Sequence, residues 1–352
     1  MSREHGYQTA VSGAEDRTRS PGRLRRWSRR LALAVLVLFA AVTLAALAFD
    51  FATSGSARPA GSLYPGPFVR VDGTLLAYRT WDSRGSPVVL LGGAAEPSWV
   101  WHGVGPLLAR AGHRVYALDL PPFGYSQRRG PYTMTRWLQL LEGFEQRLHI
   151  LRPVLVGHSL GAGVAAAAAL AHPHDVTGVV LLDGDGLAFG GNHRWLSELL
   201  VYPYYTALYR LVTGSGWIVG RVFRSAWGPN PPHPNHATLA QFERPFRVQG
   251  TAAALKQLLA NGIPGLTLAQ LAHLRVPRAV IWGADDNVDS LGSGRTTAAA
   301  LHTHLQTIPR AGHLSMLAQP RATASRILHF TATSADAKSQ GRLARPGRRH
   351  DR

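Results

Sequence analysis

The chain contains Val154-Leu-Val-Gly-His-Ser-Leu-Gly-Ala-Gly-Val-Ala-Ala-Ala-Ala-Ala169, in which an apolar run leads through a Gly-x-Ser-x-Gly turn into small residues. The apolar run predicts a buried strand, and the small residues predict a helix that begins directly after Ser159. Such a turn strains the backbone at its central residue and leaves no room for side chains beside it, so glycines flank the serine. The Ser159 hydroxyl would then stand out at the carboxyl end of the strand. The backbone amide of Leu160, at the helix N-terminus, is a candidate donor to a developing oxyanion.

Apolar runs alternate with helical stretches on both sides of this segment. Asp72-Gly73 separates two short runs, which predicts a hairpin because Asp-Gly supplies the positive φ angles of a tight turn. Strands that alternate with helices indicate a parallel sheet covered on both faces. The further predicted strands are 87–92, 113–120, 177–183, 278–283 and 301–309.

Residues 184–274 differ in composition from the chain around them. They are rich in tyrosine and tryptophan, and glycines at 214–216 and prolines at 229–234 interrupt their helical stretches. This pattern predicts a mostly helical cap, inserted into a core formed by residues 68–183 and 275–331. A cap above a reactive group supplies apolar walls and excludes water.

Residues 31–51 are predicted to form a transmembrane helix or signal anchor. Residues 31–49 include only Thr43 as a polar side chain, and about 20 apolar residues span a bilayer as a helix. Arginines crowd the preceding segment, so the positive-inside rule places the N-terminus in the cytoplasm and the catalytic domain outside. Two alternatives stay open: a cleaved signal, giving a secreted protein, and a helix buried in the protein itself. Ser28-Arg29-Arg30 also resembles part of a twin-arginine export signal.

Three segments are predicted to lie outside the folded units: 1–30 as a disordered basic cytoplasmic tail, 52–67 as a linker, and 332–352 as a disordered basic tail. Much of the formal net charge of +18 lies in the two tails, with seven arginines in 17–30 and five in 342–352. Nucleic-acid binding requires basic charge gathered on one face, so we expect no nucleic-acid partner. The absence of cysteine excludes disulfides, thiolate metal sites and cysteine nucleophiles.

A serine hydroxyl becomes a nucleophile when an imidazole accepts its proton and a carboxylate fixes the tautomer of that imidazole. Trp282-Gly-Ala-Asp-Asp286 follows one predicted strand, and Ala311-Gly-His313 follows the next. The predicted catalytic residues are therefore Ser159, Asp286 and His313, in this chain order. Other acids remain alternatives to Asp286: Asp285, Asp289, and Asp183 after the preceding strand.

These motifs resemble those of the α/β-hydrolase superfamily, over residues 68–331. Asp119-Leu-Pro-Pro-Phe-Gly-Tyr-Ser126 is similar to the loop after the family's fourth strand, and the segments ending at Asp286 and His313 are similar to its acid and histidine loops. The closest resemblance is to cap-bearing serine hydrolases, a group of esterases, carbon–carbon bond hydrolases and haloperoxidase-like enzymes. The resemblance implies an eight-stranded, mostly parallel sheet with helices on both faces and a helical cap insertion.

The resemblance also implies how an oxyanion would be held. The family takes one amide from the residue after a His-Gly pair that follows the third strand, and this sequence has Gly92-Gly93-Ala94 at that place. Glycine thus replaces the usual histidine, but the donor is a backbone amide. Ala94 and Leu160 are therefore the expected oxyanion-hole residues. No metal and no organic cofactor are expected.

We expect a membrane-anchored serine hydrolase that cleaves an ester-like bond of a small apolar substrate through an acyl-enzyme. A serine at the turn argues against haloalkane dehalogenases and epoxide hydrolases, relatives that use aspartate there. Alternatives with the same fold are an aminopeptidase, a thioesterase and an acyltransferase. A non-catalytic surface binding module is the alternative outside enzymes.

Overall fold

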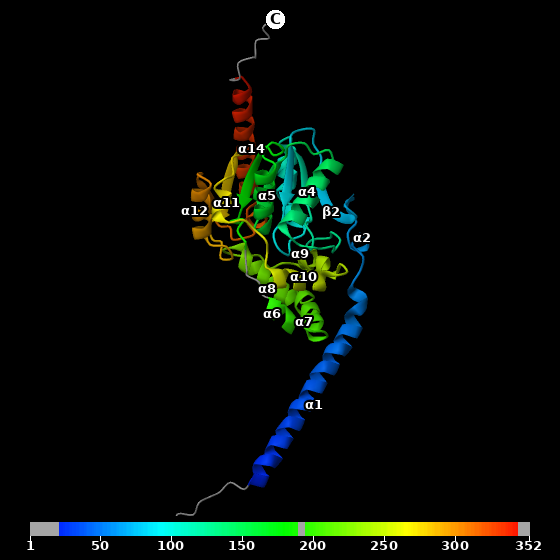
Figure 1. Ribbon diagram of the computed structural model, residues 1–352. Coiled ribbons are helices and arrows are strands. Elements are labelled where there is room, and N and C mark those ends of the chain that lie inside the picture. Colours follow the sequence, from blue (N-terminus) through cyan, green and yellow to red (C-terminus); the bar gives the residue numbers. More distant parts are fainter. Residues whose placement is uncertain (1–20, 189–193, 344–352) are drawn as a thin grey trace, which may run out of the picture.

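A computed structural model describes residues 21–188 and 194–343 (Figure 1). Parts of the two predicted basic tails, 1–20 and 344–352, lie outside the described residues, as do residues 189–193 of the predicted cap. A central sheet with helices on both faces forms the body of the molecule. The N-terminal helix α1 and the C-terminal helix α14 project from opposite ends of this body.

The sheet has eight strands in the order β1-β2-β4-β3-β5-β6-β7-β8. The pairs β1·β2 and β2·β4 are antiparallel, and the other neighbours are parallel, so the expectation of an eight-stranded, mostly parallel sheet is confirmed. The strands β3, β5 and β6 are almost entirely buried, as their apolar runs predicted. The bounds are β1 Phe68–Val71, β2 Thr74–Trp81, β3 Pro87–Leu91, β4 Arg114–Leu118, β5 Val154–His158, β6 Gly178–Leu182, β7 Arg278–Gly283 and β8 Leu305–Ile308.

The first two strands form the predicted hairpin. Val71 pairs with Thr74, and the two turn residues between them have positive φ angles of 44° at Asp72 and 74° at Gly73. Aspartate and glycine are among the residues that adopt this conformation at little cost. The turn therefore fixes the register that puts Leu76 and Ala77 into the core.

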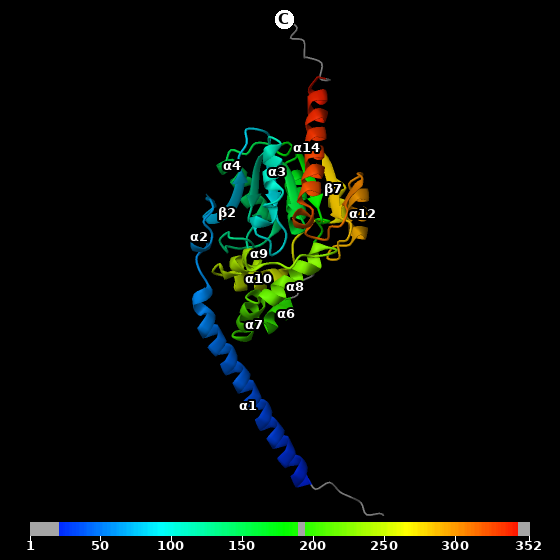
Figure 2. The ribbon, with the colours of Figure 1, turned by 180° about the vertical axis from the view of Figure 1, so that it is seen from behind.

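Helices cover the two faces of the sheet. Figure 1 shows α4 and α5 in front of the sheet, and Figure 2 shows α3 and α14 on the opposite face. The small side chains of α5 let it lie close against β5 and β6, and most of its residues are buried. The bounds are α3 Gly105–Arg110, α4 Met134–Arg147, α5 Leu160–Ala171, α12 Leu291–Ala300, α13 Ser315–Ala318 and α14 Pro320–Leu343, with the 3-10 helix η2 at Ser98–Trp101.

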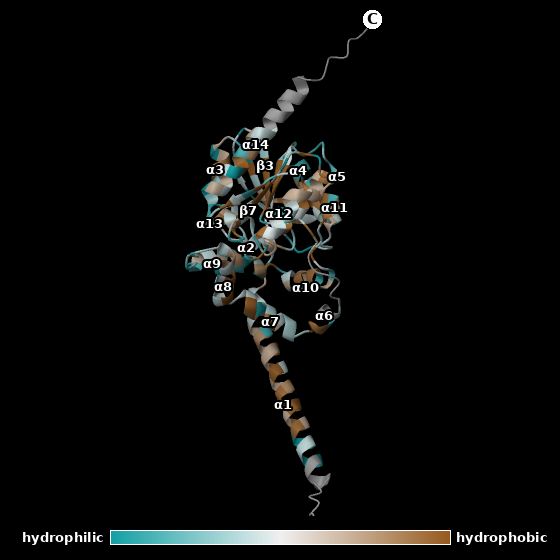
Figure 3. Ribbon diagram, turned by 90° about the vertical axis from the view of Figure 1, so that its left-hand side faces the viewer, coloured by the Kyte–Doolittle hydropathy of each residue, from teal (hydrophilic) through white to brown (hydrophobic). Residues whose placement is uncertain are grey.

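Helices also fill the chain between β6 and β7, where the sequence predicted a cap. We call α6 to α10 the inserted helices; they lie between the sheet and α1 (Figures 1 and 3). Side-chain hydrogen bonds cap two of them: the Ile218 amide donates to the Ser215 hydroxyl, and the Thr238 amide donates to Asn235 Oδ1. The bounds are α6 Arg194–Leu199, α7 Tyr204–Thr213, α8 Gly216–Trp227, α9 His236–Glu243 and α10 Thr251–Asn261, with η3 at Arg244–Arg247 and the short α11 at Leu268–Leu271.

The structure corrects three predicted segment boundaries. Helix α1 spans Pro21–Thr53, so the prediction of disorder is wrong for residues 21–30. Proline suits the first position of a helix and arginine is a good helix former, so the basic segment continues the apolar helix. The prediction of disorder from residue 332 is also wrong, because α14 continues to Leu343 through residues that favour helix.

The third correction concerns residues 52–67, which were predicted to be a linker. They contain η1 Ser54–Ser56 and α2 Ala60–Leu63, and they are attached to the body. The Arg58 amide donates to the Arg247 carbonyl at 2.8 Å, and the buried ring of Tyr64 stacks on Tyr125 at a centroid distance of 4.9 Å. The high content of glycine, serine and proline in this segment therefore did not reveal the contacts by which it packs on the body.

We predict that Gly157→Ala destabilises the fold by about 2 kcal/mol, in the range typical of overpacked cores. A Cβ at residue 157 would lie 2.1 Å from the Gly161 carbonyl oxygen, which belongs to the backbone and cannot turn aside. The control is Gly61→Ala, where a Cβ would meet nothing within 4 Å. Thermal unfolding of both variants in detergent checks this, and equal melting temperatures would contradict the packing argument.

Candidate active site

Ser159 occupies the turn between β5 and α5 in a strained conformation, with φ 50° and ψ −121°. Few non-glycine residues adopt a positive φ, and those that do are concentrated at functional sites. The surrounding backbone leaves room only for glycine. A Cβ on Gly161 would lie 2.6 Å from the Leu91 carbonyl oxygen, and one on Gly184 would lie 2.5 Å from the Ser159 Cα. The close packing of these backbone segments therefore holds Ser159 at the carboxyl edge of the sheet.

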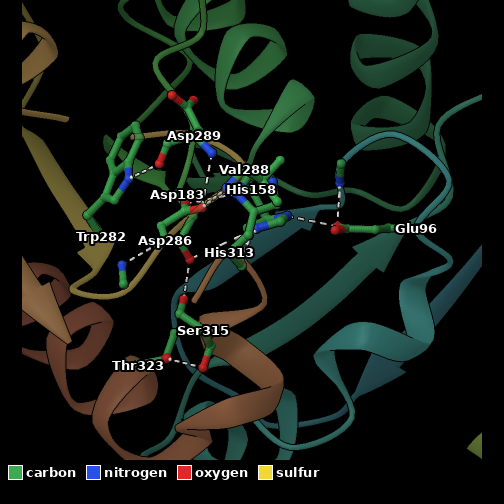
Figure 4. A network of polar contacts seen from close by, with 12 residues as sticks. Glu96, His158, Asp183, Trp282, Asp286, Val288, Asp289, His313, Ser315 and Thr323 are labelled. Carbon is green, nitrogen blue, oxygen red and sulfur yellow. Dashed lines mark hydrogen bonds and ion pairs between the residues drawn. The ribbon is translucent and has the colours of Figure 1, made fainter. Parts of the chain in front are cut away.

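His313 and Asp286 come together at the same edge of the sheet, after β8 and β7. The Nδ1 atom of His313 lies 2.9 Å from Asp286 Oδ2, and the Asp286 side chain is fully buried (Figure 4). The other carboxylate oxygen, Oδ1, accepts hydrogen bonds from the amides of Val288 and Asp289. Since a carboxylate can only accept, His313 Nδ1 carries the proton and Nε2 is left as the basic nitrogen.

The three alternative acids do not contact His313 in this way. Asp285 is exposed. Asp183 is buried, but it accepts from the Gly283 amide at 2.5 Å and from the Ser315 hydroxyl, and so it joins β6 to β7 and α13. Burial raises the pKa of Asp289, and no hydrogen bond joins its carboxylate to His313 among the described residues.

Two cavities meet at Ser159 and His313. The first has a volume of about 360 Å³ and is walled mainly by apolar side chains of α7, α8 and α9 together with Ala94. The second, of about 350 Å³, is lined by Ala94 and Leu160 and by the chain after β6 and before α11. The predicted nucleophile, base and oxyanion donors thus border shared space. The apolar wall of the first cavity includes Val212, Ile218, Val219, Val222, Phe223 and Phe242.

A buried ion pair lies beneath this group and was not foreseen from the sequence (Figure 4). His158 Nδ1 lies 2.8 Å from Glu96 Oε2, and its Nε2 lies 2.7 Å from the His313 carbonyl oxygen. The same Glu96 oxygen accepts from the Gly93 amide at 2.6 Å. Since both ring nitrogens of His158 face acceptors, both carry protons, and His158 is a cation.

The electrostatics agree with this assignment. Burial favours neutral His158, but the charge of Glu96 and its hydrogen bond outweigh burial and, with Asp183, raise the pKa of His158 to about 9. Burial likewise favours neutral Glu96, yet the His158 charge and hydrogen bond, with the Gly93 amide, lower the pKa of Glu96. Burial raises the pKa of Asp183 to about 7 despite the opposing effect of His158.

This pair holds two loops at the edge of the sheet. Glu96 holds the Gly93-Ala94 loop by its backbone, and His158 holds the loop of His313 through a carbonyl. A signal was available in the sequence: a histidine at the buried end of a strand needs a charged partner, and Glu96 is the acid in the adjacent loop. Within residues 21–188 and 194–343, no group of three His, Cys, Asp or Glu side chains is placed to hold a metal ion.

Comparison with known proteins agrees with this architecture. A family model described as the alpha/beta hydrolase fold matches residues 86–217. The uncharacterized hydrolase YugF of Bacillus subtilis (strain 168) is 25% identical over 268 residues, covering 74% of this chain and 95% of that protein. A 2-hydroxymuconate semialdehyde hydrolase of Pseudomonas sp. (strain CF600) is 28% identical over 261 residues, covering 71% of this chain and 88% of that protein.

Two solved structures share the fold. The meta-cleavage product hydrolase of Pseudomonas fluorescens IP01 superposes with a TM-score of 0.63 at 20% identity, covering 76% of this chain and 98% of that one. A structure described as a membrane phospholipase A and bacterial virulence factor gives 0.62 at 22% identity, covering 88% and 99%. The chain has the α/β-hydrolase fold. The two curated relatives are themselves named as hydrolases, and hydrolysis is the class of reaction that they and the fold support for this chain.

We predict that Glu96→Gln lowers the free energy of unfolding of this protein by about 3 kcal/mol near pH 7, because it removes the nearest charged partner of a buried cation and leaves only Asp183, at 3.9 Å. A folded-state pKa of about 9 against 6.5 unfolded gives stability that is complete below pH 6.5 and lost as pH rises through 9. The wild type should therefore lose more stability than the variant between pH 7 and 9.5, as measured by thermal unfolding in detergent.

The matched control is Glu198→Gln, which makes the same change at an exposed position. It should keep the wild-type dependence on pH. A Glu96→Gln variant that loses as much stability as the wild type over this range would show that the ion pair does not control it.

Proposed function

We propose that this α/β-hydrolase is a membrane-anchored serine hydrolase that cleaves an ester-like bond of a small apolar substrate. The observation that carries the proposal is the hydrogen bond between His313 and Asp286 beside an apolar cavity that His313 shares with Ser159. A serine in a strained turn, a base with a free nitrogen and a buried acid are the parts that acyl transfer requires.

In the proposed reaction, His313 Nε2 takes the proton of the Ser159 hydroxyl as Oγ attacks the substrate carbonyl carbon. The backbone amides of Ala94 and Leu160 donate to the oxyanion that forms on the carbonyl oxygen. The alcohol leaves with the proton from His313, and the acyl group stays on Oγ as an ester. Water then attacks the acyl-enzyme, gives its proton to His313, and releases the acid and the free serine.

The walls of the two cavities support an uncharged substrate. Neither is lined by lysine or arginine, and the second includes Asp185 and Asp289. A carboxylate group would find no cationic partner there, which disfavours a muconate-type compound such as the one named for the Pseudomonas relative. The apolar walls of the first cavity suit an ester with an apolar acyl part. The phospholipase among the structural neighbours acts, by its name, on lipid esters. Aminopeptidase, thioesterase and acyltransferase activities use the same parts with other substrates.

We propose that α1 anchors the enzyme in the membrane. The span Arg25–Ser56, which runs from α1 into η1, has a mean hydropathy of 2.8 in its most apolar window, and none of that window is buried in the protein. The side chain of Trp27, beside several arginines at the N-terminal end, is exposed as expected for an interfacial residue. The competing interpretation is that this segment is a cleaved signal and that the enzyme is secreted. The arginines favour an N-terminus in the cytoplasm and a catalytic domain on the other side.

We predict that Ser159→Ala abolishes both the hydrolysis of short p-nitrophenyl esters and labelling by a fluorophosphonate probe, since no other group can take the acyl chain. Assay of the purified full-length protein in detergent measures both. Ser315→Ala, which alters a buried serine bonded to Asp183, is a control that should still be labelled. Labelling that persists in Ser159→Ala would refute the nucleophile.

We predict that Asp286→Asn lowers kcat by about 10³- to 10⁴-fold, because asparagine no longer holds the imidazole in the reactive tautomer. Asp285→Asn changes the neighbouring, exposed acid and should alter kcat by less than about twofold. Steady-state kinetics on one soluble ester compare the two variants. A larger effect at residue 285 than at residue 286 would move the acid role to that residue.

A further inference from the structure

Helices α6 and α7 lie at the end of the body nearest α1 (Figures 1 and 3), and several apolar side chains of the inserted helices are exposed. Helix α7 exposes Leu208 and Leu211, and its only charged side chain is Arg210. A soluble surface rarely gathers large apolar residues in one continuous patch. We call this group the apolar tip: Trp195, Leu199, Val201, Tyr202, Leu208, Leu211 and Trp217.

Direct contacts join this tip to the apolar helix α1. The Thr43 and Tyr204 hydroxyls are 2.6 Å apart, and the Tyr204 ring lies 6.1 Å from that of Phe39. One and a half turns further along α7, the Arg210 guanidinium donates to the Asp50 carbonyl and the Thr53 hydroxyl and lies 3.4 Å from the Asp50 carboxylate. The two helices therefore run side by side in the same direction.

These contacts fix the depth of α7 relative to a bilayer that α1 would cross. Residues 31–49 of α1 give a helix of about 28 Å, close to the thickness of the hydrocarbon layer. Thr43 lies six residues before the end of that run. It is therefore about 9 Å from the outer edge of the hydrocarbon layer. Tyr204 shares this level, whereas the Arg210–Asp50 pair lies where α1 leaves the apolar layer. Along both helices, the contact within the apolar layer therefore comes first and the charged pair comes at the edge of that layer.

We infer that the apolar tip is immersed in the outer leaflet of the bilayer, so that α1 and the inserted helices contact lipid as one continuous surface. The inference rests on the proposed anchoring by α1. Arg221 lies 5.3 Å from the centre of the Trp217 ring, an arrangement suited to the membrane interface.

Immersion also determines how a substrate arrives. Val212 and Val222 are exposed, and both line the apolar cavity at Ser159, so the rim of the cavity belongs to the same surface as the tip. An acyl chain could pass from the lipid into the cavity without crossing water. The substrate class that this arrangement favours is an ester with an apolar chain that partitions into the membrane.

Because the chain contains no cysteine, single labels can be placed in the full-length protein. Leu199→Cys and Leu208→Cys report on the tip and Val37→Cys on the anchor. Leu151→Cys is the matched control, since Leu151 is 77% exposed against 67% for Leu199 but precedes β5 at the opposite end of the sheet. Each variant is labelled with a nitroxide and reconstituted in phosphatidylcholine vesicles, and its collisions with oxygen and with a polar nickel chelate are compared.

The expected result is that labels at 37, 199 and 208 collide preferentially with oxygen, and the label at 151 with the nickel chelate. Labels at 199 and 208 that behave like the one at 151, while 37 lies in lipid, would overturn the immersion of the tip and leave the anchor standing. A label at 37 in water would overturn both. Hydrolysis of a soluble ester by the same samples tests the proposed chemistry separately and does not depend on depth.

A second measurement tests the substrate route. The double variant Leu199→Glu/Leu208→Glu should lower hydrolysis of a long-chain ester held in vesicles by about tenfold, because charge opposes insertion of the tip. Neither residue lines the cavity, so hydrolysis of a short soluble ester should stay unchanged. Equal activity of variant and wild type on the vesicle substrate would contradict entry through the tip.

Discussion

The close packing of backbone around Ser159 is the constraint on which the rest of the site depends. Gly157, Gly161 and Gly184 surround the turn at distances that exclude a Cβ, so α5 starts directly above the end of β5. This proximity leaves the serine in a positive φ and places Leu160, the first residue of α5, beside the second cavity. Every other group of the site reaches that space from the end of a parallel strand, because such ends share one edge of the sheet.

Much of this could be predicted from the sequence because the relevant signals are local. Apolar runs of strand length and the Asp72-Gly73 turn gave the sheet, and the positions of Asp286 and His313 after successive strands gave the pairing that the structure contains. The strand-order argument could not distinguish Asp286 from Asp285, since adjacent residues share a strand end. Only the loop conformation, in which two amides hold Asp286, decides which of them turns inward.

The Glu96–His158 pair could not be read from spacing because its partners are distant in sequence and meet only after β3 and β5 pair. The physical role of the pair follows from the absence of a side chain at Gly92. The loop after β3 has no side chain at residue 92 to hold it, and Glu96 holds it instead through the Gly93 amide. A buried ion pair costs desolvation energy and adds modest net stability, but it fixes orientation, since each ring nitrogen of His158 has its own hydrogen-bond acceptor. The loop of Gly93 and Ala94 and the loop of His313 are thereby positioned by one pair of side chains.

Backbone hydrogen bonds join the inserted helices to the loop of His313. The Gly312 amide donates to the Trp227 carbonyl at 2.8 Å, and the Leu314 amide donates to the Ala226 carbonyl at 2.9 Å, so the residues on both sides of His313 are bonded to the end of α8. Helix α8 carries the apolar wall of the cavity, and α7 before it contacts α1. A series of direct contacts therefore runs from α1 through α7 and α8 to His313. If α1 stands across a bilayer, the orientation of the cavity toward the membrane is set by these contacts and needs no separate mobile lid.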